Sequence, residues 1–254
     1  MAPAEWRVVT AMTFVDLLSA LYLDHDVAAL DRLYLHRAIR RQQGGRLFGR
    51  SAIRQAILSD LARFEGWDVT IHAGTDTFVD LEWLSPDGVR VRRHHWAWYE
   101  NDRIAADVVI TQGKAETPLS THHGLLGELD SGRGQIGPGP LSGFSETSCQ
   151  LHTLWNGRSL ASLKQLYHDG LVWQGPEDRG GLRDLKAWWL KQFLTYPQSH
   201  IIFEREVAFG GHIALLWQWG RIDGQGVRTR VTGSSLLNSV DGRIAVETLL
   251  TDEG

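Results

Sequence analysis

The chain has 254 residues, enough for two domains of ordinary size, and its 43% of apolar and 22% of charged residues are typical of a globular protein with a buried core. The net charge of −4 is spread along the chain without a block of Lys and Arg, which argues against nucleic acid or an anionic lipid surface as the main partner. A single cysteine excludes a disulfide framework, and because no membrane-length apolar run or signal-peptide pattern is present, we expect a cytoplasmic protein with no membrane partner.

The first part of the chain is predicted to form three helices followed by four strands. Apolar residues at helical spacing predict helices over 8–21, 27–34 and 53–64. Alternating apolar residues predict strands over 67–71, 77–83, 89–99 and 104–111. Turn residues at 86–88 and 101–102 join neighbouring strands as hairpins.

A stretch rich in glycine and proline follows. From Gly113 to Gly143 the sequence contains eight glycines and three prolines, which cannot sustain a helix or a central strand. We therefore predict a linker over 114–143 that separates a first domain, 1–113, from a second domain, 144–254.

The second domain is predicted to repeat the order of the first. Its apolar spacing indicates helices around 151–155, 160–167 and 182–193, and then strands over 201–209, 213–219, 227–237 and 244–250. The string Arg-Ile-Ala-x-acid beginning at Arg103 recurs at Arg243, an offset of 140 residues, and Leu-x-x-Leu-Tyr ends at both Tyr34 and Tyr167. Such offsets indicate a tandem duplication with small changes in loop length.

Short motifs in both repeats resemble one known family. The segment 167–176, Tyr-His-Asp-Gly-Leu-Val-Trp-Gln-Gly-Pro, is similar to the stretch between the second helix and first strand of the SnoaL-like branch of the nuclear transport factor 2-like (NTF2-like) superfamily. Gly-Arg-Ser-Ala-Ile at 49–53 is similar to the start of that family's third helix, and both repeats end in a strand similar to the family's last. The resemblance implies an α+β fold of two cone-shaped domains, each with three helices packed on a curved, mostly antiparallel sheet, in a cystatin-like α+β barrel.

The resemblance also implies a class of activity. Enzymes of this superfamily resemble cofactor-free acid–base catalysts, such as aldol cyclases, ketosteroid isomerases and limonene epoxide hydrolases. It therefore implies isomerisation, cyclisation or hydrolysis of a small apolar or aromatic molecule in an apolar pocket, without a cofactor. The repeats differ, because His36 and Arg40 stand where the second repeat has Asp169 and Trp173. The two pockets cannot be chemically identical, and which of them is active is left open.

The first catalytic candidates are two acids, one on the last strand of each repeat. Asp107 and Glu247 occupy equivalent positions and each shares its strand face with apolar residues. A carboxyl group in apolar surroundings has a raised pKa and can act as a general base near neutral pH. The alternative is that this face is partly solvated or that the acids pair with arginine.

Further candidates could donate or transfer a proton. His94 and His95 point to opposite faces of one strand, so one of them faces the pocket or an interface. Tyr34 and Tyr167 could donate a hydrogen bond to a developing oxyanion, although a tyrosine that ends an apolar stripe also suits a core. The family pattern adds Asp169.

Aromatic and basic side chains are candidates for ligand binding. They are Trp96, Trp98, Trp173, Arg40 and Trp217. Packing in the core or between sheets is the alternative for the tryptophans. No spacing of His, Cys, Asp or Glu typical of a metal site occurs, and His122-His123 does not provide one, so no metal is expected.

A non-catalytic role is the alternative function. Members of this fold commonly dimerise through their sheets, and a duplicated chain could form such a pseudo-dimer within itself or assemble into a homo-oligomer. The chain would then be a ligand-binding or oligomerisation module.

Overall fold

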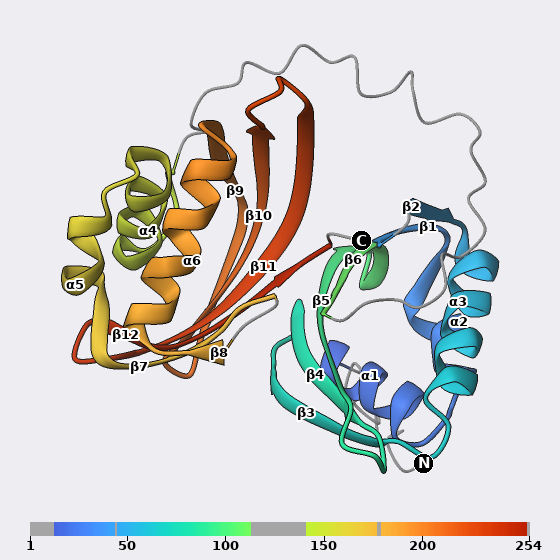
Figure 1. Cartoon of the computed structure of the whole chain (residues 1–254). Helices are drawn as coiled ribbons and strands as arrows, with labels where there is room; N and C mark the ends of the chain where they lie inside the picture. Colours follow the sequence, from blue (N-terminus) through green and yellow to red (C-terminus); the bar gives the residue numbers. More distant parts are fainter. Residues whose placement is uncertain (1–12, 44, 113–140, 177–178, 253–254) are drawn as a thin grey trace, which may run out of the picture. The chain divides into compact units, whose positions relative to one another are not determined.

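The computed structural model describes residues 13–43, 45–112, 141–176 and 179–252. The chain forms two compact units, and its strands form two sheets of six strands each (Figure 1). Helices pack against both sheets, so the predicted α+β class is confirmed. No helix in the described part of the chain is long and apolar enough to cross a membrane.

The first sheet and its three helices lie between Phe14 and Thr111. The helices are α1 (Phe14–Tyr22), α2 (Ala29–Leu33) and α3 (Arg50–Arg63). The strands are β1 (Tyr34–Gln42), β2 (Gly45–Phe48), β3 (Asp68–Gly74), β4 (Phe78–Leu84), β5 (Arg90–Glu100) and β6 (Arg103–Thr111), in the order β2-β1-β6-β5-β4-β3. The Thr13 hydroxyl accepts a hydrogen bond from the Asp16 amide, and the Asp16 carboxylate accepts one from the Thr13 amide, so a capping box fixes the start of α1.

The second sheet repeats this topology. The helices are α4 (Glu146–Gly157), α5 (Leu163–Leu166), which follows a 3₁₀ turn at Leu160–Ser162, and α6 (Leu182–Thr195). The strands are β7 (Tyr167–Gln174), β8 (Arg179–Gly180), β9 (Gln198–Phe209), β10 (His212–Ile222), β11 (Arg228–Val240) and β12 (Arg243–Thr251). Their order, β8-β7-β12-β11-β10-β9, is that of the first sheet with every number raised by six. The repeat predicted from the sequence is therefore confirmed in the topology.

The prediction that helices run through Tyr34 and Tyr167 was wrong, because both residues begin strands. The strands β1, β2, β7 and β8 were not predicted. β7 pairs in parallel with β12, and its register shifts between the partners of Ile244 and Val246, which leaves 168–171 without a regular partner. This irregularity breaks the two-residue alternation that identifies a strand in a sequence.

Parts of two predictions lie outside the described residues. The structure describes the first helix from Phe14 onward, so the predicted start at Val8 and Met12 is not covered. Of the predicted linker, only 141–143 are described, and they lie in a turn region before α4. The domain boundaries at 113 and 144 stay a prediction.

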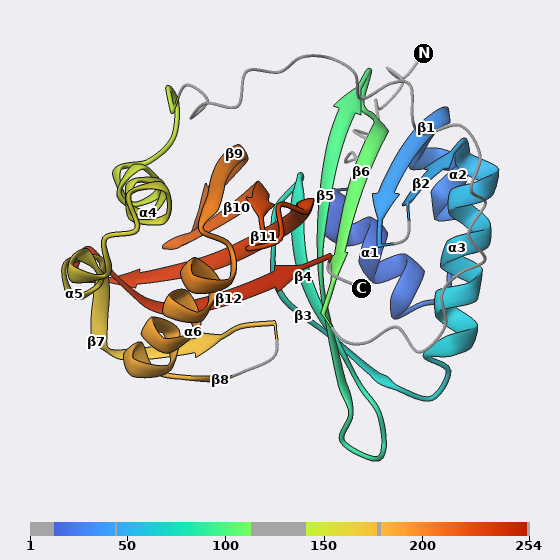
Figure 2. The same ribbon diagram turned by 45° about the horizontal axis from the view of Figure 1, so that its top comes forward.

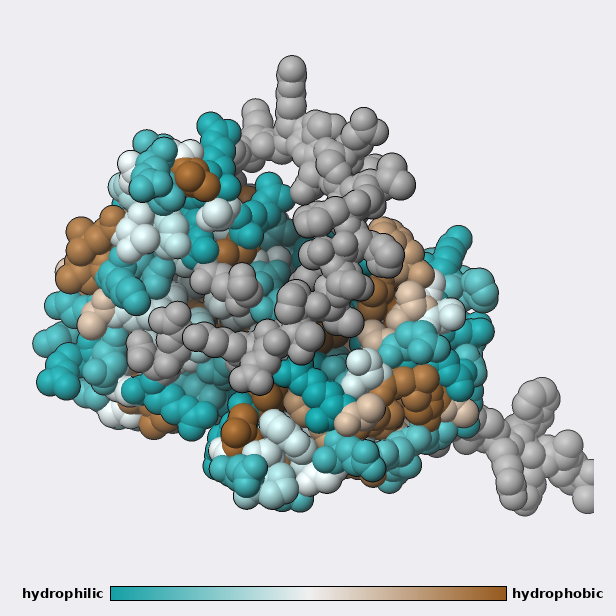
Figure 3. Space-filling model, turned by 45° about the vertical axis from the view of Figure 1, so that its right-hand side comes forward, coloured by the Kyte–Doolittle hydropathy of each residue, from teal (hydrophilic) through white to brown (hydrophobic). Residues whose placement is uncertain are grey.

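The core of the second unit is unusually rich in tryptophan. Six of the eleven tryptophans of the chain belong to one buried cluster between the helices and the sheet. Two glycines make room for them, because a Cβ atom at Gly233 would collide with the ring of Trp217 and one at Gly175 with the ring of Trp173. Figures 1 and 2 show α6 crossing the face of this sheet. On the face seen in Figure 3, hydrophobic residues form separate patches among hydrophilic ones.

Candidate functional site

A tyrosine and an acid meet in each unit. The first residue of β1, Tyr34, donates a hydrogen bond of 2.8 Å from its hydroxyl to Oδ2 of Asp107 on β6. The first residue of β7, Tyr167, donates one of 2.9 Å to Oε2 of Glu247 on β12. All four residues are at most 1% exposed. The sequence identified the tyrosines and acids separately, and the structure brings each tyrosine to the acid of its own repeat.

In the first unit a buried arginine completes the site. Nε of Arg40 lies 3.2 and 2.9 Å from the two carboxylate oxygens of Asp107, and its Nη2 donates to Oδ2 at 2.6 Å and to the Tyr34 hydroxyl at 3.1 Å. Burial lowers the pKa of Arg40, but the charge of Asp107, the nearby Tyr34 and Tyr22 and the hydrogen bond to Asp107 together more than offset this and hold the pKa well above its ordinary value. Burial and the charge of Asp107 raise the pKa of Tyr34, so its hydroxyl keeps its proton. The alternative weighed for the acids, a pair with arginine, therefore holds for Asp107.

In the second unit no cation among the described residues pairs with the acid. The residue six positions after Tyr167 is Trp173, and the polar partners of Glu247 in the described residues are the hydroxyls of Tyr167 and Ser235. Burial raises the pKa of Glu247 to about 7, although both hydroxyls act to lower it. Ser235 is itself oriented by Trp217, whose Nε1 donates to its Oγ at 3.1 Å. Burial, and then the charge of Glu247, raise the pKa of Tyr167, which makes its hydroxyl a permanent donor.

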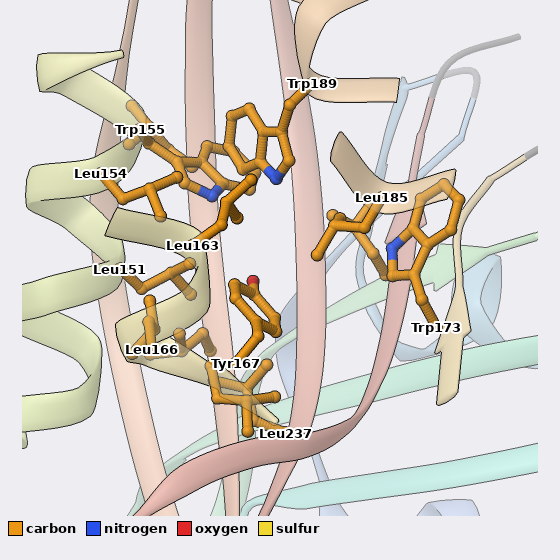
Figure 4. Close-up of a cluster of buried hydrophobic side chains, with 14 of the residues drawn as sticks. Leu151, Leu154, Trp155, Leu163, Leu166, Tyr167, Trp173, Leu185, Trp189 and Leu237 are labelled. Atoms are coloured by element: carbon orange, nitrogen blue, oxygen red, sulfur yellow. The ribbon is translucent and has the colours of Figure 1, made fainter. Parts of the chain in front are cut away.

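Several buried polar atoms around this pair make no hydrogen bond. They are Oε1 of Glu247 and Nε1 of Trp155, Trp173 and Trp189, none of which has a partner within the described parts of the chain. Figure 4 shows the Tyr167 hydroxyl directed into the same cluster of tryptophan and leucine side chains. A buried donor or acceptor without a partner costs about 1–3 kcal/mol, so such groups are candidates for contacts with a ligand.

A pocket of about 160 Å³ lies beside α6 at the ends of β10 and β12. Its lining includes Trp188, Lys191 and Tyr196 from α6 and its end, and Trp219 and Thr251 from the strands. Thr251 is four residues beyond Glu247 on β12, and therefore shares its strand face.

Trp188 lines the pocket, and it packs on Trp173, which lies beside Glu247 on the adjacent strand. The ring of Trp188 lies 5.8 Å from that of Trp173, which is paired with Glu247 across the sheet. The two rings therefore connect the pocket lining to the strand position beside Glu247.

The histidines of β5 lie on opposite faces of that strand. His95 contacts Phe14 and Tyr22 of α1, with ring centroids 6.4 and 6.1 Å apart, and therefore faces the helices. At the offset of 140 residues its counterpart is Ser235. His94 alternates to the opposite face and is not brought to Asp107.

The remaining predicted residues are spread over three places. Trp96 and Trp98 share the face of His94, and Trp96 packs on Phe78 with 4.8 Å between ring centroids. Asp169 is exposed in the irregular part of β7, away from Glu247. His36, its counterpart in β1, is also exposed. Trp173 and Trp217 belong to the core of the second unit. No group of three or more His, Cys, Asp or Glu residues in the described ranges could hold a metal ion.

Sequence reasoning missed Ser235 and the indole nitrogen of Trp155. Ser235 could have been found from two signals. It precedes Leu237, the strand partner of Glu247, by two residues, so it lies on the same strand face. It is also the counterpart of His95 at the offset of 140 residues that relates Asp107 to Glu247. The indole nitrogen of Trp155 could not have been found, because its lack of a hydrogen-bond partner in the described residues depends on how α4 packs on the sheet.

Comparison with known proteins finds a family match within the second unit. Residues 150–247 match the family of SnoaL-like domains. A search of curated proteins finds no match.

Three solved structures illustrate the likeness. IdmH from Streptomyces antibioticus, a candidate polyketide cyclase, is 18% identical, with 42% of this chain and 89% of that chain covered and a TM-score of 0.38. An NTF2-like protein of unknown function from Exiguobacterium sp. 255-15 is 14% identical, with 42% and 99% covered and a TM-score of 0.39. A protein with a ketosteroid isomerase-like fold from Catenulispora acidiphila is 14% identical, with 41% and 83% covered and a TM-score of 0.38. The match to the SnoaL-like domain family thus covers residues 150–247, in the second unit, and the first unit repeats the strand order of the second.

Proposed function

We propose that the second domain is a cofactor-independent acid–base catalyst that isomerises, cyclises or hydrolyses a small apolar or aromatic molecule. One observation carries the proposal: Glu247 is buried, no cation in the described part of the chain pairs with it, and burial raises its pKa to about 7. Such a carboxyl group is populated in both protonation states near neutral pH, so it can take a proton in one step and return it in the next.

The surrounding residues have distinct roles in this mechanism. Glu247 removes a proton from a carbon next to a carbonyl group, or from water in the case of hydrolysis. Tyr167 keeps its own proton and stabilises the ionised carboxylate through its hydrogen bond to Oε2. The unpaired indole N–H groups of Trp155 and Trp189 are available to donate to the oxygen on which negative charge develops. The proton then returns from Glu247 to another atom of the product.

The first domain has a different role in this proposal. Its acid already forms three short contacts with a buried guanidinium, so removal of a proton by Asp107 would break an ion pair in the interior. This observation favours the non-catalytic alternative for the first domain. The chain would combine one catalytic copy with one structural copy.

The test uses the full chain and 5-nitrobenzisoxazole, a fused two-ring molecule whose isoxazole ring opens when a base removes its carbon-bound proton. The N–O bond then breaks and a coloured cyanophenolate forms, so no cofactor is needed. The expected rate rises with pH through about 7, as Glu247 ionises. Glu247→Gln should abolish the catalysed rate.

A matched control distinguishes the site from the rest of the domain. Glu146 is exposed in the first turn of α4, and Glu146→Gln makes the same chemical change away from the interior. This control should retain the full rate. A Glu247→Gln protein that is folded and still catalyses ring opening would refute the assignment.

A further inference from the structure

Three side chains form a hydrogen-bonded line across the sheet of the second unit. Trp217 lies on β10, Ser235 on β11 and Glu247 on β12, and these strands are neighbours in the sheet. Nε1 of Trp217 donates to Oγ of Ser235 at 3.1 Å, and the Ser235 hydroxyl is in turn hydrogen-bonded to the carboxyl group of Glu247. All three residues are at most 1% exposed, so bulk water does not compete for these hydrogen bonds.

The register of the strands places Ser235 between the two longer side chains. Trp217 is paired with Gly233 of β11. Glu247 is paired with Leu237 of the same strand. Ser235 lies two residues from each of these partners and on the same strand face, so it is the diagonal neighbour of both Trp217 and Glu247. Diagonal neighbours are about 7–8 Å apart, which long side chains can span, and both therefore reach the short Ser235 hydroxyl.

Gly233 gives the Trp217 ring its place in this line. A Cβ atom at Gly233 would collide with the ring, so the indole lies directly against the glycine as it crosses from β10 to β11. Trp155 packs on the same ring, with centroids 5.1 Å apart and planes at 66°. These two contacts fix the indole, and with it the position of its N–H group.

The hydrogen bonds of the line have a defined direction. An indole N–H group can only donate, so Ser235 accepts from Trp217. An ionised carboxylate can only accept, so the single hydroxyl hydrogen of Ser235 points to Glu247. At the carboxyl group, Oε2 accepts a hydrogen bond from Tyr167, whereas Oε1 has no partner within the described ranges. Oε1 is therefore the oxygen that is free to take a proton.

The first unit has a valine in place of Trp217. The turns that follow β4 and β10 begin with the same backbone hydrogen bonds, at Ser85 and Asp223. This equivalence makes Val79 of β4 the counterpart of Trp217. A valine side chain has no hydrogen-bonding group, so it cannot orient a residue on the next strand. The tryptophan therefore belongs to the copy whose acid is not paired with an arginine in the part of the chain that the structure describes.

We propose that Trp217 is a positioning residue for the general base: its N–H group fixes the Ser235 hydroxyl as a donor to Glu247 and so keeps Oε1 free for the substrate. The catalytic consequence rests on the proposed function, whereas the hydrogen-bonded line does not. The other neighbours of Glu247 do not provide this control, because Tyr167 acts from β7 and the charged residue of α5, which also packs on β12, is the exposed Lys164.

The experiment measures the pKa of Glu247 in the full chain without substrate. Carbon NMR follows its side-chain carboxyl signal, which is identified by its absence in Glu247→Gln. Ser235→Ala should raise this pKa by about 1–2 units, the worth of a hydrogen bond to a charged group. Trp217→Phe should raise it by less, because the hydroxyl remains but is no longer fixed. In the Ser235→Ala protein, Trp217→Phe should cause no further shift, because its effect passes through the hydroxyl.

Two further variants separate the hydrogen bond from the packing of the core. Trp219→Phe removes an indole from the same face of β10 and should leave the pKa of Glu247 unchanged, because Ser235 accepts from Trp217. Gly233→Ala keeps the Trp217 indole but displaces it from Ser235, so it should raise the pKa and decides the question if Trp217→Phe does not fold. An unchanged or lower pKa in Trp217→Phe or Gly233→Ala, additive shifts in the double variant, or an equal shift in Trp219→Phe would overturn the proposal.

The outcome is distinct from that of the proposed function. If the pKa shifts occur as expected but Glu247→Gln still opens 5-nitrobenzisoxazole, the hydrogen-bonded line stands and the catalytic assignment fails. If Glu247→Gln abolishes ring opening while Trp217→Phe leaves the pKa unchanged, the proposed function stands and Trp217 is not a positioning residue. If both proposals hold, Trp217→Phe should move the midpoint of the pH profile of kcat/KM by the same amount as the pKa measured by NMR.

Discussion

Replacement of Glu247 by glutamine should stabilise the protein at alkaline pH and not at acid pH. Burial raises the pKa of Glu247 from its ordinary value of 4.5 to about 7, so between these values the folded state holds a proton that the unfolded state has released. Stability must then fall as the pH rises through this interval, because the unfolded state binds fewer protons. Glutamine has a similar shape and no charge, and it removes this dependence.

The magnitude follows from the same interval. Each pH unit between 4.5 and about 7 is worth about 1.4 kcal/mol, which gives a penalty of about 3 kcal/mol for the ionised carboxylate above pH 8. Solvent does not screen the charge and reduce this penalty, because Glu247 is only 1% exposed. Glu247→Gln should therefore raise the free energy of unfolding by about 3 kcal/mol at pH 8 and leave it nearly unchanged at pH 4.

Urea denaturation of both proteins between pH 4 and pH 9, followed by circular dichroism, measures this difference. The exposed control Glu146→Gln should show no such pH dependence. If the Glu247→Gln protein were less stable than the wild type at pH 8, or if its advantage were the same at pH 4 and pH 8, the buried, uncompensated carboxyl would not be the cause.

Three further substitutions test the surroundings of the two acids. Arg40→Met leaves Asp107 buried without its cation and should cost about 3–5 kcal/mol of stability in urea denaturation, and a loss under 1 kcal/mol would contradict the buried ion pair. Ser235→Ala removes a hydrogen bond that lowers the pKa of Glu247, so the midpoint of the pH–rate profile for ring opening should move above 7, and an unchanged or lower midpoint would exclude that role. Gly233→Ala places a methyl group against the Trp217 ring and should lower the thermal midpoint through a loss of about 1–3 kcal/mol, whereas an unchanged midpoint would show that the ring can move aside.

Much of the fold could be predicted because it is local and repeated. The helices α3, α4 and α6 and the strands β3 to β6 and β9 to β12 follow clear apolar periodicities, and the duplication gives each pattern a second instance. The strands β1 and β7 escaped prediction because each follows a helix of four or five residues and is irregular in its burial. Their place in the sheet depends on pairing with a strand far away in the sequence.

The candidate site could be predicted as a set of residues but not as a set of interactions. Alternation and the repeat identified Asp107 and Glu247, and the sequence also showed that Arg40 and Trp173 differ between the copies. It could not show that Arg40 turns toward Asp107, because that contact crosses from β1 to β6. Nor could it show that Glu247 lacks a cation, since this is a property of all the side chains that surround it.

The tryptophans that surround Glu247 have one further consequence. Trp217 is joined to the carboxyl group through the Ser235 hydroxyl, and Trp173 lies beside it on the adjacent strand. Indole emission responds to the charge and proton-donating power of its neighbours, so ionisation of Glu247 changes the light that these residues emit. The tryptophan fluorescence of the protein therefore reports the protonation state of Glu247. It can be followed during a pH titration with no substrate present.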